Sequence, residues 1–476
     1  ALHAAQADPH ATVALDPEVP ASIRAAGGST PDTARAFLLN LAALPNETLQ
    51  LPYADPDVTL ERAAGAAALI APTSFAGGGE VPAAPSPAPG ASATATPAPT
   101  PTATPVPART DLLKWSYSPV RVGWPLPGTT TGADLAFLKT SGYPVALLSS
   151  TDVRDTRARV AAGPLARVGG AQVLVADATV SRLLTAAAAD GGTAADSALA
   201  TLMGVLGTDA MAGEAGSVLA VPARDQRARP GLGRVLGLVA QQRWISGTRI
   251  ADLLIQASPA PVALVPGSVP ASRVGAARSA IRGETGVRHL GRAADGSAPL
   301  TGPHRLGLVA VLSAAWRSDE RGYPKAVATV DRAFTAFRNQ VRFDQGSAIT
   351  YIGGSGSLPV RVVNNLTRPV RIEVSGLASN GRLRVVGTAS ATIAPESLGL
   401  VKLPVRSISN GTVDVTLTLR TPDGYPIGTS STASITVNTG WETVGAIVFV
   451  VALLALFGTG VYRNVRRARR KIRRTT

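Results

Sequence analysis

The sequence has no cysteine among its 476 residues, which excludes disulfide bonds, thiolate zinc sites and cysteine nucleophiles. Its four histidines form neither an HxH nor an HExxH pair, so the sequence predicts no metal site. It also lacks the GxSxG motif of serine hydrolases and the glycine-rich phosphate loop. These absences give no support for nucleophilic or metal-dependent catalysis, and we expect no cofactor.

Positive charge is concentrated at the carboxyl end of the chain. The net charge is +15, and residues 463–476 contain eight arginines and lysines with no acidic residue. A general nucleic-acid binder would carry its basic residues across a folded surface. The distribution therefore argues against a nucleic-acid partner.

An uncharged apolar run of twenty residues precedes this basic tail, from Thr443 to Tyr462. A helix of that length spans roughly 30 Å, the thickness of the hydrocarbon layer of a bilayer. Trp441 and Tyr462 border the run, where amphipathic rings favour the headgroup region. We predict a transmembrane helix over residues 441–462; the alternative is a buried core helix.

The basic residues that follow the span predict its orientation. Arg463, Arg466 and Arg467 come directly after it, and by the positive-inside rule the 463–476 tail is cytoplasmic. We expect the tail to contact anionic lipid, and we expect the amino-terminal bulk to lie outside the plasma membrane. Export requires a signal sequence, which the opening residues Ala1-Leu2-His3 do not provide. Either the signal has been cleaved or the chain is part of a longer protein, and we favour the second interpretation.

Residues 1–345 alternate short apolar segments with helical patterns. The alternation continues on both sides of residues 80–109, a Pro-, Ala- and Thr-rich stretch that we interpret as a disordered insertion. About eight βα units predict a β/α barrel of parallel strands, with an open doubly wound sheet as the alternative. The expected strands are Thr12–Leu15, Thr48–Tyr53, Ala68–Ala71, Val120–Trp124, Val145–Leu148, Gln172–Val175, Ser217–Val221 and Val262–Val265.

The hydrophobic period changes to two after residue 346. Leu358, Val360 and Val362 alternate with polar residues or proline, and similar alternation begins at Val370 and Val413. Asn410-Gly411 is typical of a tight turn. Residues 346–440 are therefore predicted to form an immunoglobulin-like β-sandwich.

Several expected strands end in an aspartate, including Asp16, Asp55, Asp57 and Asp177. In a β/α barrel these positions rim the face that carries active sites, so two of them are candidates for the acid and base of glycoside hydrolysis. The competing interpretation is that each caps the helix that follows. Asp55-x-Asp57 is the most site-like pair. Trp124 is a candidate platform for a sugar ring, although a packed tryptophan explains it equally well.

Several segments of the chain form a recognisable set: VALDPEV, LPYADPDV, GWPLPGTTTGADLAFLKTSGY, VLVADATVSRLL and LPVRVVNNLTRPVRIEV, followed by the apolar helix and its arginine tail. Together they resemble an uncharacterised family of actinobacterial membrane proteins that is usually encoded beside the lipid II flippase. The resemblance implies an export signal and a barrel similar to glycoside hydrolases or polysaccharide deacetylases. It also implies a role in the cell envelope. The Asp and HxH metal set of active deacetylases has no match here.

Two functions follow from these features. The first is a non-catalytic accessory factor in peptidoglycan-precursor export or cell-wall assembly, whose partners are the bilayer, a glycan, and the lipid II flippase or other cell-wall synthesis proteins. The second is a membrane-anchored carbohydrate hydrolase that uses the rim carboxylates. An enzyme requires two carboxyl groups about 5–10 Å apart in a cleft, whereas scattered helix caps favour the binding protein.

Overall fold

A computed structural model describes residues 2–75, 108–155, 163–211, 217–224, 229–256, 259–295, 297–344, 349–352, 355–438 and 441–472. Nearly all of the predicted 80–109 insertion lies outside these residues. The chain divides into two compact units, Ala1–Thr285 with Ala298–Phe334, and Gly286–Ser297 with Thr335–Thr476. Helices α11 (Ala271–Ala293) and α13 (Tyr323–Arg338) have residues in both units.

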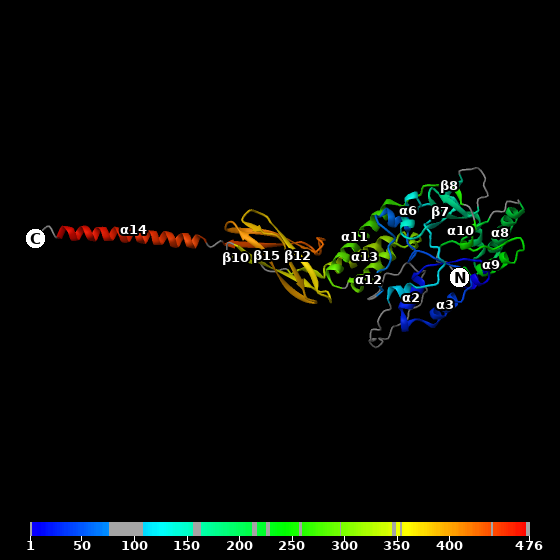
Figure 1. The fold of residues 1–476 in the computed structure, drawn as a ribbon, viewed down its shortest axis with the longest axis horizontal. Helices are drawn as coiled ribbons and strands as arrows, with labels where there is room; N and C mark the ends of the chain where they lie inside the picture. The colour runs from blue at the N-terminus through cyan, green and yellow to red at the C-terminus, as the bar shows by residue number, and fades with distance from the viewer. Residues whose placement is uncertain are drawn as a thin grey trace. The chain divides into compact units, whose positions relative to one another are not determined.

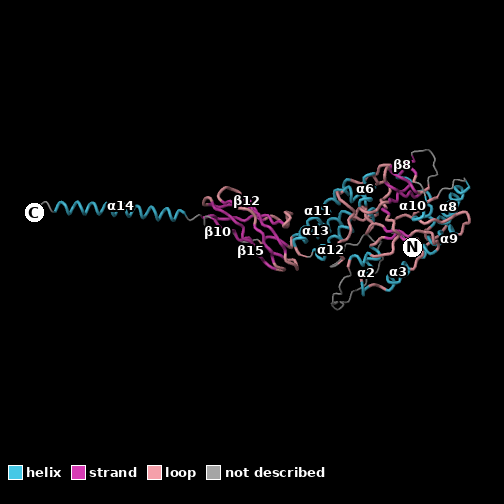
Figure 2. Tube along the Cα trace, in the orientation of Figure 1, coloured by secondary structure: helices cyan, strands magenta, loops and turns pink. Residues whose placement is uncertain are grey.

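The first unit is built on a mixed six-stranded sheet with the order β3-β4-β7-β6-β8-β5. A separate parallel pair, β1-β2, is linked to β3 by an isolated bridge between Gln50 and Arg121. Figures 1 and 2 show these strands among the surrounding helices. The strands are β1 (Val13–Leu15), β2 (Thr48–Gln50), β3 (Val122–Gly123), β4 (Val145–Ser149), β5 (Val153–Asp155), β6 (Leu165–Val168), β7 (Ala171–Ala176) and β8 (Ala260–Leu264).

Successive residues of β4 alternate between the two faces of this sheet, and each face has its own apolar core. Ala146 and Leu148 pack with Leu138, whereas Val145 and Leu147 pack with Leu174. The flanking helices are α1 (Leu2–Gln6), α2 (Glu18–Ala25), α3 (Asp32–Ala42), α4 (Val58–Ala63), α5 (Arg109–Leu113), α6 (Gly132–Thr140), α7 (Ala178–Ala187), α8 (Thr193–Met211), α9 (Leu232–Ala240), α10 (Ile250–Gln256) and α12 (Ser297–Val311). Short 3₁₀ helices are η1 (Gly27–Ser29), η2 (Ser150–Asp152) and η3 (Ala314–Arg317).

The prediction of a parallel β/α barrel is wrong. β6 and β7 form an antiparallel hairpin through Gly169-Gly170, with Gly169 at a φ of +56°. A two-residue glycine turn favours such a hairpin, and it reverses the chain where a barrel requires a crossover helix. β5 is also antiparallel to β8 at the sheet edge.

Two of the expected barrel strands are not strands, because side chains bind their backbone groups. The N–H group of Leu69 donates to the Ser141 hydroxyl, and the N–H group of Ile70 donates to an oxygen of the Glu61 carboxyl group. Similarly, the Val221 N–H donates to the Ser181 hydroxyl. Backbone groups satisfied in this way do not need a neighbouring strand.

The second unit contains two largely antiparallel sheets, with the orders β10-β17-β16-β12-β14 and β13-β15-β11-β9. The predicted alternation is present, since Leu358, Val360 and Val362 of β11 are buried and their neighbours along the strand are more exposed. The strands are β9 (Val341–Phe343), β10 (Ile349–Ile352), β11 (Ser355–Asn364), β12 (Val370–Ala378), β13 (Leu383–Val385), β14 (Ala389–Ile393), β15 (Ser397–Ser407), β16 (Gly411–Arg420) and β17 (Ser431–Asn438).

The sheets of the second unit face each other across a shared core. At Gly376 of β12, an added Cβ would lie 3.1 Å from Leu403 of β15 in the other sheet. A further close approach joins Gly399 of β15 and Ile393 of β14. Strands β9 to β17 therefore form a β-sandwich.

Helix α14 (Trp441–Ile472) contains the predicted membrane span. Within the described residues, Ile447–Arg466 is the one segment long and apolar enough to cross a membrane, and none of it is buried. This exposure is inconsistent with a buried core helix. Arg466 lies 5.9 Å from the Tyr462 ring, and Arg463 follows Tyr462 on the same helix. The structure does not describe the side chains of Trp441 and Arg467.

Candidate functional site

Asp57, in the first unit, is a buried helix cap that is paired with arginines. Its carboxylate is fully buried and caps α4 by accepting hydrogen bonds from the Leu60 N–H and the Thr59 hydroxyl. Arg317 Nε lies 3.3 Å from the Asp57 carboxylate, and Arg273 lies 4.0 Å away. These contacts cap α4 and pair the carboxylate with two arginines, so the role they indicate is structural. Because Asp57 is fully buried, a substrate cannot reach it.

Asp177 likewise caps a helix, since its carboxylate accepts a 2.8 Å hydrogen bond from the Val180 N–H at the start of α7. The Asp177 N–H donates to the carbonyl of Leu219. The residue therefore joins the end of β7 to the neighbouring extended segment. Its position agrees with the capping interpretation.

Asp16 and Asp55 lie after the parallel strands β1 and β2, where the structure brings them together. Asp16 Oδ1 accepts hydrogen bonds from the N–H groups of Glu18, at 2.8 Å, and Ala54, at 2.9 Å. Ala54 and Asp55 have φ values of 62° and 45°, a left-handed conformation that is uncommon for residues other than glycine. The bend directs the Asp55 carbonyl to the Ala314 N–H, at 2.7 Å.

Arg224 lies beside Asp55 in this cluster. Its guanidinium forms an ion pair with Asp55 and donates to the carbonyl of Trp124. It also lies 5.1 Å from the centroid of the Trp124 ring. Trp124 packs against the core cluster that contains Val122. One side of Trp124 therefore meets a cation and another meets the core, which matches the packed-tryptophan interpretation.

The ionisable groups around the ends of β1 and β2 have shifted pKa values. Burial raises the pKa of Asp16 to about 6, although two backbone N–H groups and Arg224 favour the ionised form. Desolvation and then the neighbouring Asp16 raise the pKa of Glu18 to about 7. Burial lowers the pKa of Arg224 to about 10. Such shifts are typical of functional sites and also of structural ion pairs.

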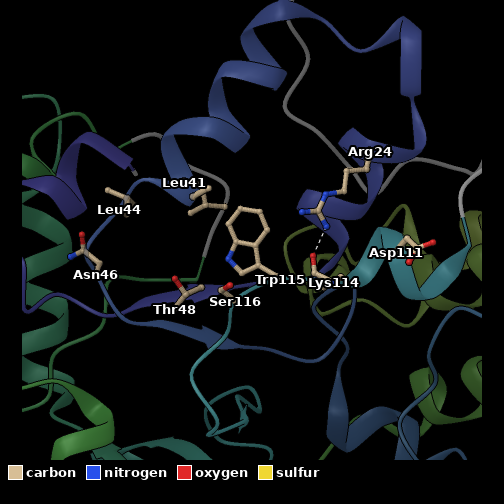
Figure 3. Close-up of a pocket in the computed structure, with 10 residues that line it drawn as sticks. Arg24, Leu41, Leu44, Asn46, Thr48, Asp111, Lys114, Trp115 and Ser116 are labelled. Carbon is tan, nitrogen blue, oxygen red and sulfur yellow. Dashed lines mark hydrogen bonds between the residues drawn. The ribbon is translucent and has the colours of Figure 1, made fainter.

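A cavity of about 440 Å³ lies elsewhere in the first unit, around the indole of Trp115 (Figure 3). This volume is within the range of small-molecule sites. Figure 3 shows Trp115 centrally, with Leu41 on one side and Thr48 and Ser116 beneath it. The lining residues are Arg24, Leu41, Ala42, Leu44, Asn46, Thr48, Asp111, Lys114, Trp115 and Ser116.

Several polar groups in this lining lack a protein partner among the described residues. Thr48 is only 9% exposed, and its hydroxyl forms no hydrogen bond there. Asn46, 6% exposed, donates from Nδ2 to the carbonyls of Ala5, Asp8 and Ala11, and its Oδ1 has no partner. Buried polar groups normally form hydrogen bonds. The Thr48 hydroxyl and Asn46 Oδ1 therefore retain hydrogen-bonding capacity that the described residues do not use.

Trp115 and its neighbours were not among the residues predicted from the sequence. The stretch Lys114-Trp115-Ser116-Tyr117 places two aromatic residues close together in a chain that is only 4% aromatic, and this was the available signal. No sequence signal identified Arg24 and Thr48, because they reach the cavity from segments that are far from Trp115 in the sequence.

The chain matches a family of unknown function, DUF6049, over residues 1–471. The chain belongs to this family. No curated protein matches the sequence.

Solved structures match only part of the chain. They include Escherichia coli alpha-2-macroglobulin from domain MG7 to the C-terminus (20% identity, 21% of this chain and 17% of that one, TM-score 0.17). Others are the Caenorhabditis elegans MSP family member WR4 (8% identity, 21% and 99%, TM-score 0.16) and a PapD-like domain of human CEP192 (11% identity, 21% and 85%, TM-score 0.16). This chain thus spans less than a fifth of the alpha-2-macroglobulin chain.

Proposed function

We propose that this protein is a single-pass membrane protein of the cell envelope that binds a glycan outside the cytoplasm and has no catalytic activity of its own. Its role is to assist peptidoglycan-precursor export or cell-wall assembly. The observation that carries the proposal is the cavity around Trp115, which combines an aromatic face with partly buried polar groups that have no partner among the described residues.

This combination suits a sugar. An aromatic ring offers an apolar face to the C–H face of a pyranose, and a few polar groups fix its orientation. The Thr48 and Ser116 hydroxyls and the Trp115 indole N–H have no hydrogen-bond partner among the described residues, so sugar hydroxyls can pair with them. Leu41 and Leu44 supply an apolar wall beside the indole.

The carboxylates support a binding role over hydrolysis. Asp57 and Asp177 cap helices, and Asp55 is paired with Arg224. A retaining or inverting glycosidase needs one carboxyl group free to donate a proton and a second free to act as nucleophile or base. With Asp55 paired with Arg224, the carboxyl groups left in this cluster are Asp16 and Glu18, and Asp16 Oδ1 already accepts hydrogen bonds from the N–H groups of Glu18 and Ala54.

Anchoring by α14 would hold the binding unit at the membrane surface, where lipid-linked cell-wall precursors emerge. The α14 segment is apolar along Ile447–Arg466, and the basic residues after it favour a cytoplasmic tail. The lipid II flippase and other cell-wall synthesis proteins are the partners that the sequence resemblance suggests. No nucleic acid is expected.

Two measurements test the proposal on the full chain. Protease added to intact spheroplasts should digest the amino-terminal bulk, and protection of that bulk would contradict the orientation. Isothermal titration with solubilised peptidoglycan fragments should show binding that Trp115→Ala abolishes and Trp244→Ala preserves. Trp244 is a matched control because it is partly exposed and does not line the cavity. Absence of binding by the wild-type protein would contradict glycan recognition.

A further inference from the structure

We infer that the cavity around Trp115 selects a sugar that carries a negative charge, a carboxylate or a phosphate, which Arg24 and Lys114 bind at one end of the cavity. This inference rests on the proposed glycan-binding function and adds the chemical class of the ligand.

Arg24 is held in place at the cavity by its own contacts. Its Nη1 donates to the carbonyls of Leu112, at 3.1 Å, and Lys114, and its guanidinium lies 5.3 Å from the Trp115 ring centroid (Figure 3). Within the described residues its Nε and Nη2 groups donate to nothing, and no carboxylate pairs with it. A guanidinium fixed at one nitrogen and free at the others can bind an anion in a bidentate manner.

Lys114 adds a second cation to the same lining. It is exposed, and among the described residues it forms no ion pair. Asp111 is the one carboxylate in the lining and is also unpaired there. Two cations and one anion give the lining residues a net positive charge. Such a lining attracts an anionic ligand more strongly than a neutral one.

The apolar and polar halves of the cavity orient such a ligand. Figure 3 shows Leu41 and Leu44 on one side of Trp115, and Arg24 and Asp111 on the other. A sugar stacked near the indole would therefore place a charged substituent toward Arg24 and its uncharged groups toward Leu44. A muramic-acid lactyl carboxylate and a glycosyl phosphate share this chemistry.

The experiment compares probes that differ in charge, titrated into the full chain in detergent. One pair is an N-acetylglucosamine–N-acetylmuramic acid disaccharide and neutral diacetylchitobiose. The second pair is N-acetylglucosamine 1-phosphate and free N-acetylglucosamine, which separates a phosphate from a carboxylate source. The variants are Lys114→Gln, Arg24→Gln and the matched control Lys139→Gln, which changes an exposed lysine outside the cavity.

We expect at least one charged probe to bind about three- to fivefold more tightly than its neutral partner, a preference that weakens as salt is raised. Lys114→Gln should reduce this preference, and Lys139→Gln, outside the cavity, should preserve both the preference and the affinity for the neutral sugar. Arg24→Gln should also reduce the preference for the charged probe.

Equal binding of the charged and neutral probes, or a preference that survives both Lys114→Gln and Arg24→Gln, would overturn this inference while leaving glycan binding in place. Failure of every sugar to bind would overturn the proposed function and this inference together.

Discussion

Arg317 Nε lies 3.3 Å from Asp57 Oδ2, and Asp57 is 0% exposed. This pair explains why a carboxylate in a site-like sequence pattern has a structural role. Removing one member of a buried ion pair leaves the other charge uncompensated. We therefore expect Asp57→Ala to lower the free energy of unfolding of the first unit by roughly 3–5 kcal/mol, measured by urea denaturation.

Asp32→Ala is the control for this substitution, because the Asp32 side chain is 98% exposed and its pair with Arg35 lies on the surface. The control should change the free energy of unfolding by less than about 1 kcal/mol. Equal effects of the two substitutions would contradict the structural assignment of Asp57.

Asp177 should contribute to stability through its cap. Asp177→Ala removes the acceptor for the Val180 N–H and should cost about 1 kcal/mol of unfolding free energy, whereas Asp177→Asn keeps a capping oxygen and should cost less. The midpoints of urea unfolding measure both effects. If alanine and asparagine prove equally damaging, the cap is not what Asp177 provides.

Glu61 should make the stability of the first unit depend on pH. Its carboxyl is buried, and burial is the main cause that raises its pKa from 4.5 to about 8, with Asp57 adding to the shift and Arg305 opposing it. The folded state therefore binds a proton that the unfolded state releases between these values, so stability falls as pH rises through this window.

Glu61→Gln removes that titration while keeping an oxygen for the Ile70 N–H. Its unfolding free energy relative to wild type should rise by about 1 kcal/mol or more between pH 5 and pH 9. A constant difference between the two proteins across that range would contradict the raised pKa.

Membrane anchoring should be sensitive to charge within α14. Leu454→Arg places a cation in the apolar segment, which costs about 2.5–3.5 kcal/mol of insertion free energy near a helix centre. We expect a smaller membrane-bound fraction on carbonate extraction. Leu377→Arg, on an exposed leucine of β12, should have no effect. Equal retention of both variants would argue against α14 as the anchor.

Sequence patterns correctly predicted the helix and strands that depend only on local hydrophobic periodicity. The apolar run of α14 and the alternation of Leu358, Val360 and Val362 each follow from hydrophobic period alone. The barrel prediction failed because the Gly169-Gly170 hairpin reverses the chain, and because Glu61 and Ser141 satisfy backbone groups at Leu69 and Ile70 that would otherwise pair in a strand.

Candidate sites were predicted less well, since they depend on tertiary contacts. The structure brings Asp16 and Asp55 together after β1 and β2, whereas the pattern after each strand favoured the pair Asp55 and Asp57 and gave no sign that Arg224 would pair with Asp55. The pattern also favoured Trp124, which is packed, over Trp115, which lines a cavity. Arg24 and Thr48 meet at that cavity only after folding.

We propose that this protein binds a glycan through Trp115 and does not cleave it. Mass spectrometry of a defined peptidoglycan fragment, incubated with the full chain and then separated into bound and released material, tests both parts. We predict intact fragment in the bound fraction, loss of binding in Trp115→Ala, and unchanged binding in Asp16→Asn. Cleaved product that forms with the wild-type protein and disappears in Asp16→Asn would contradict the account.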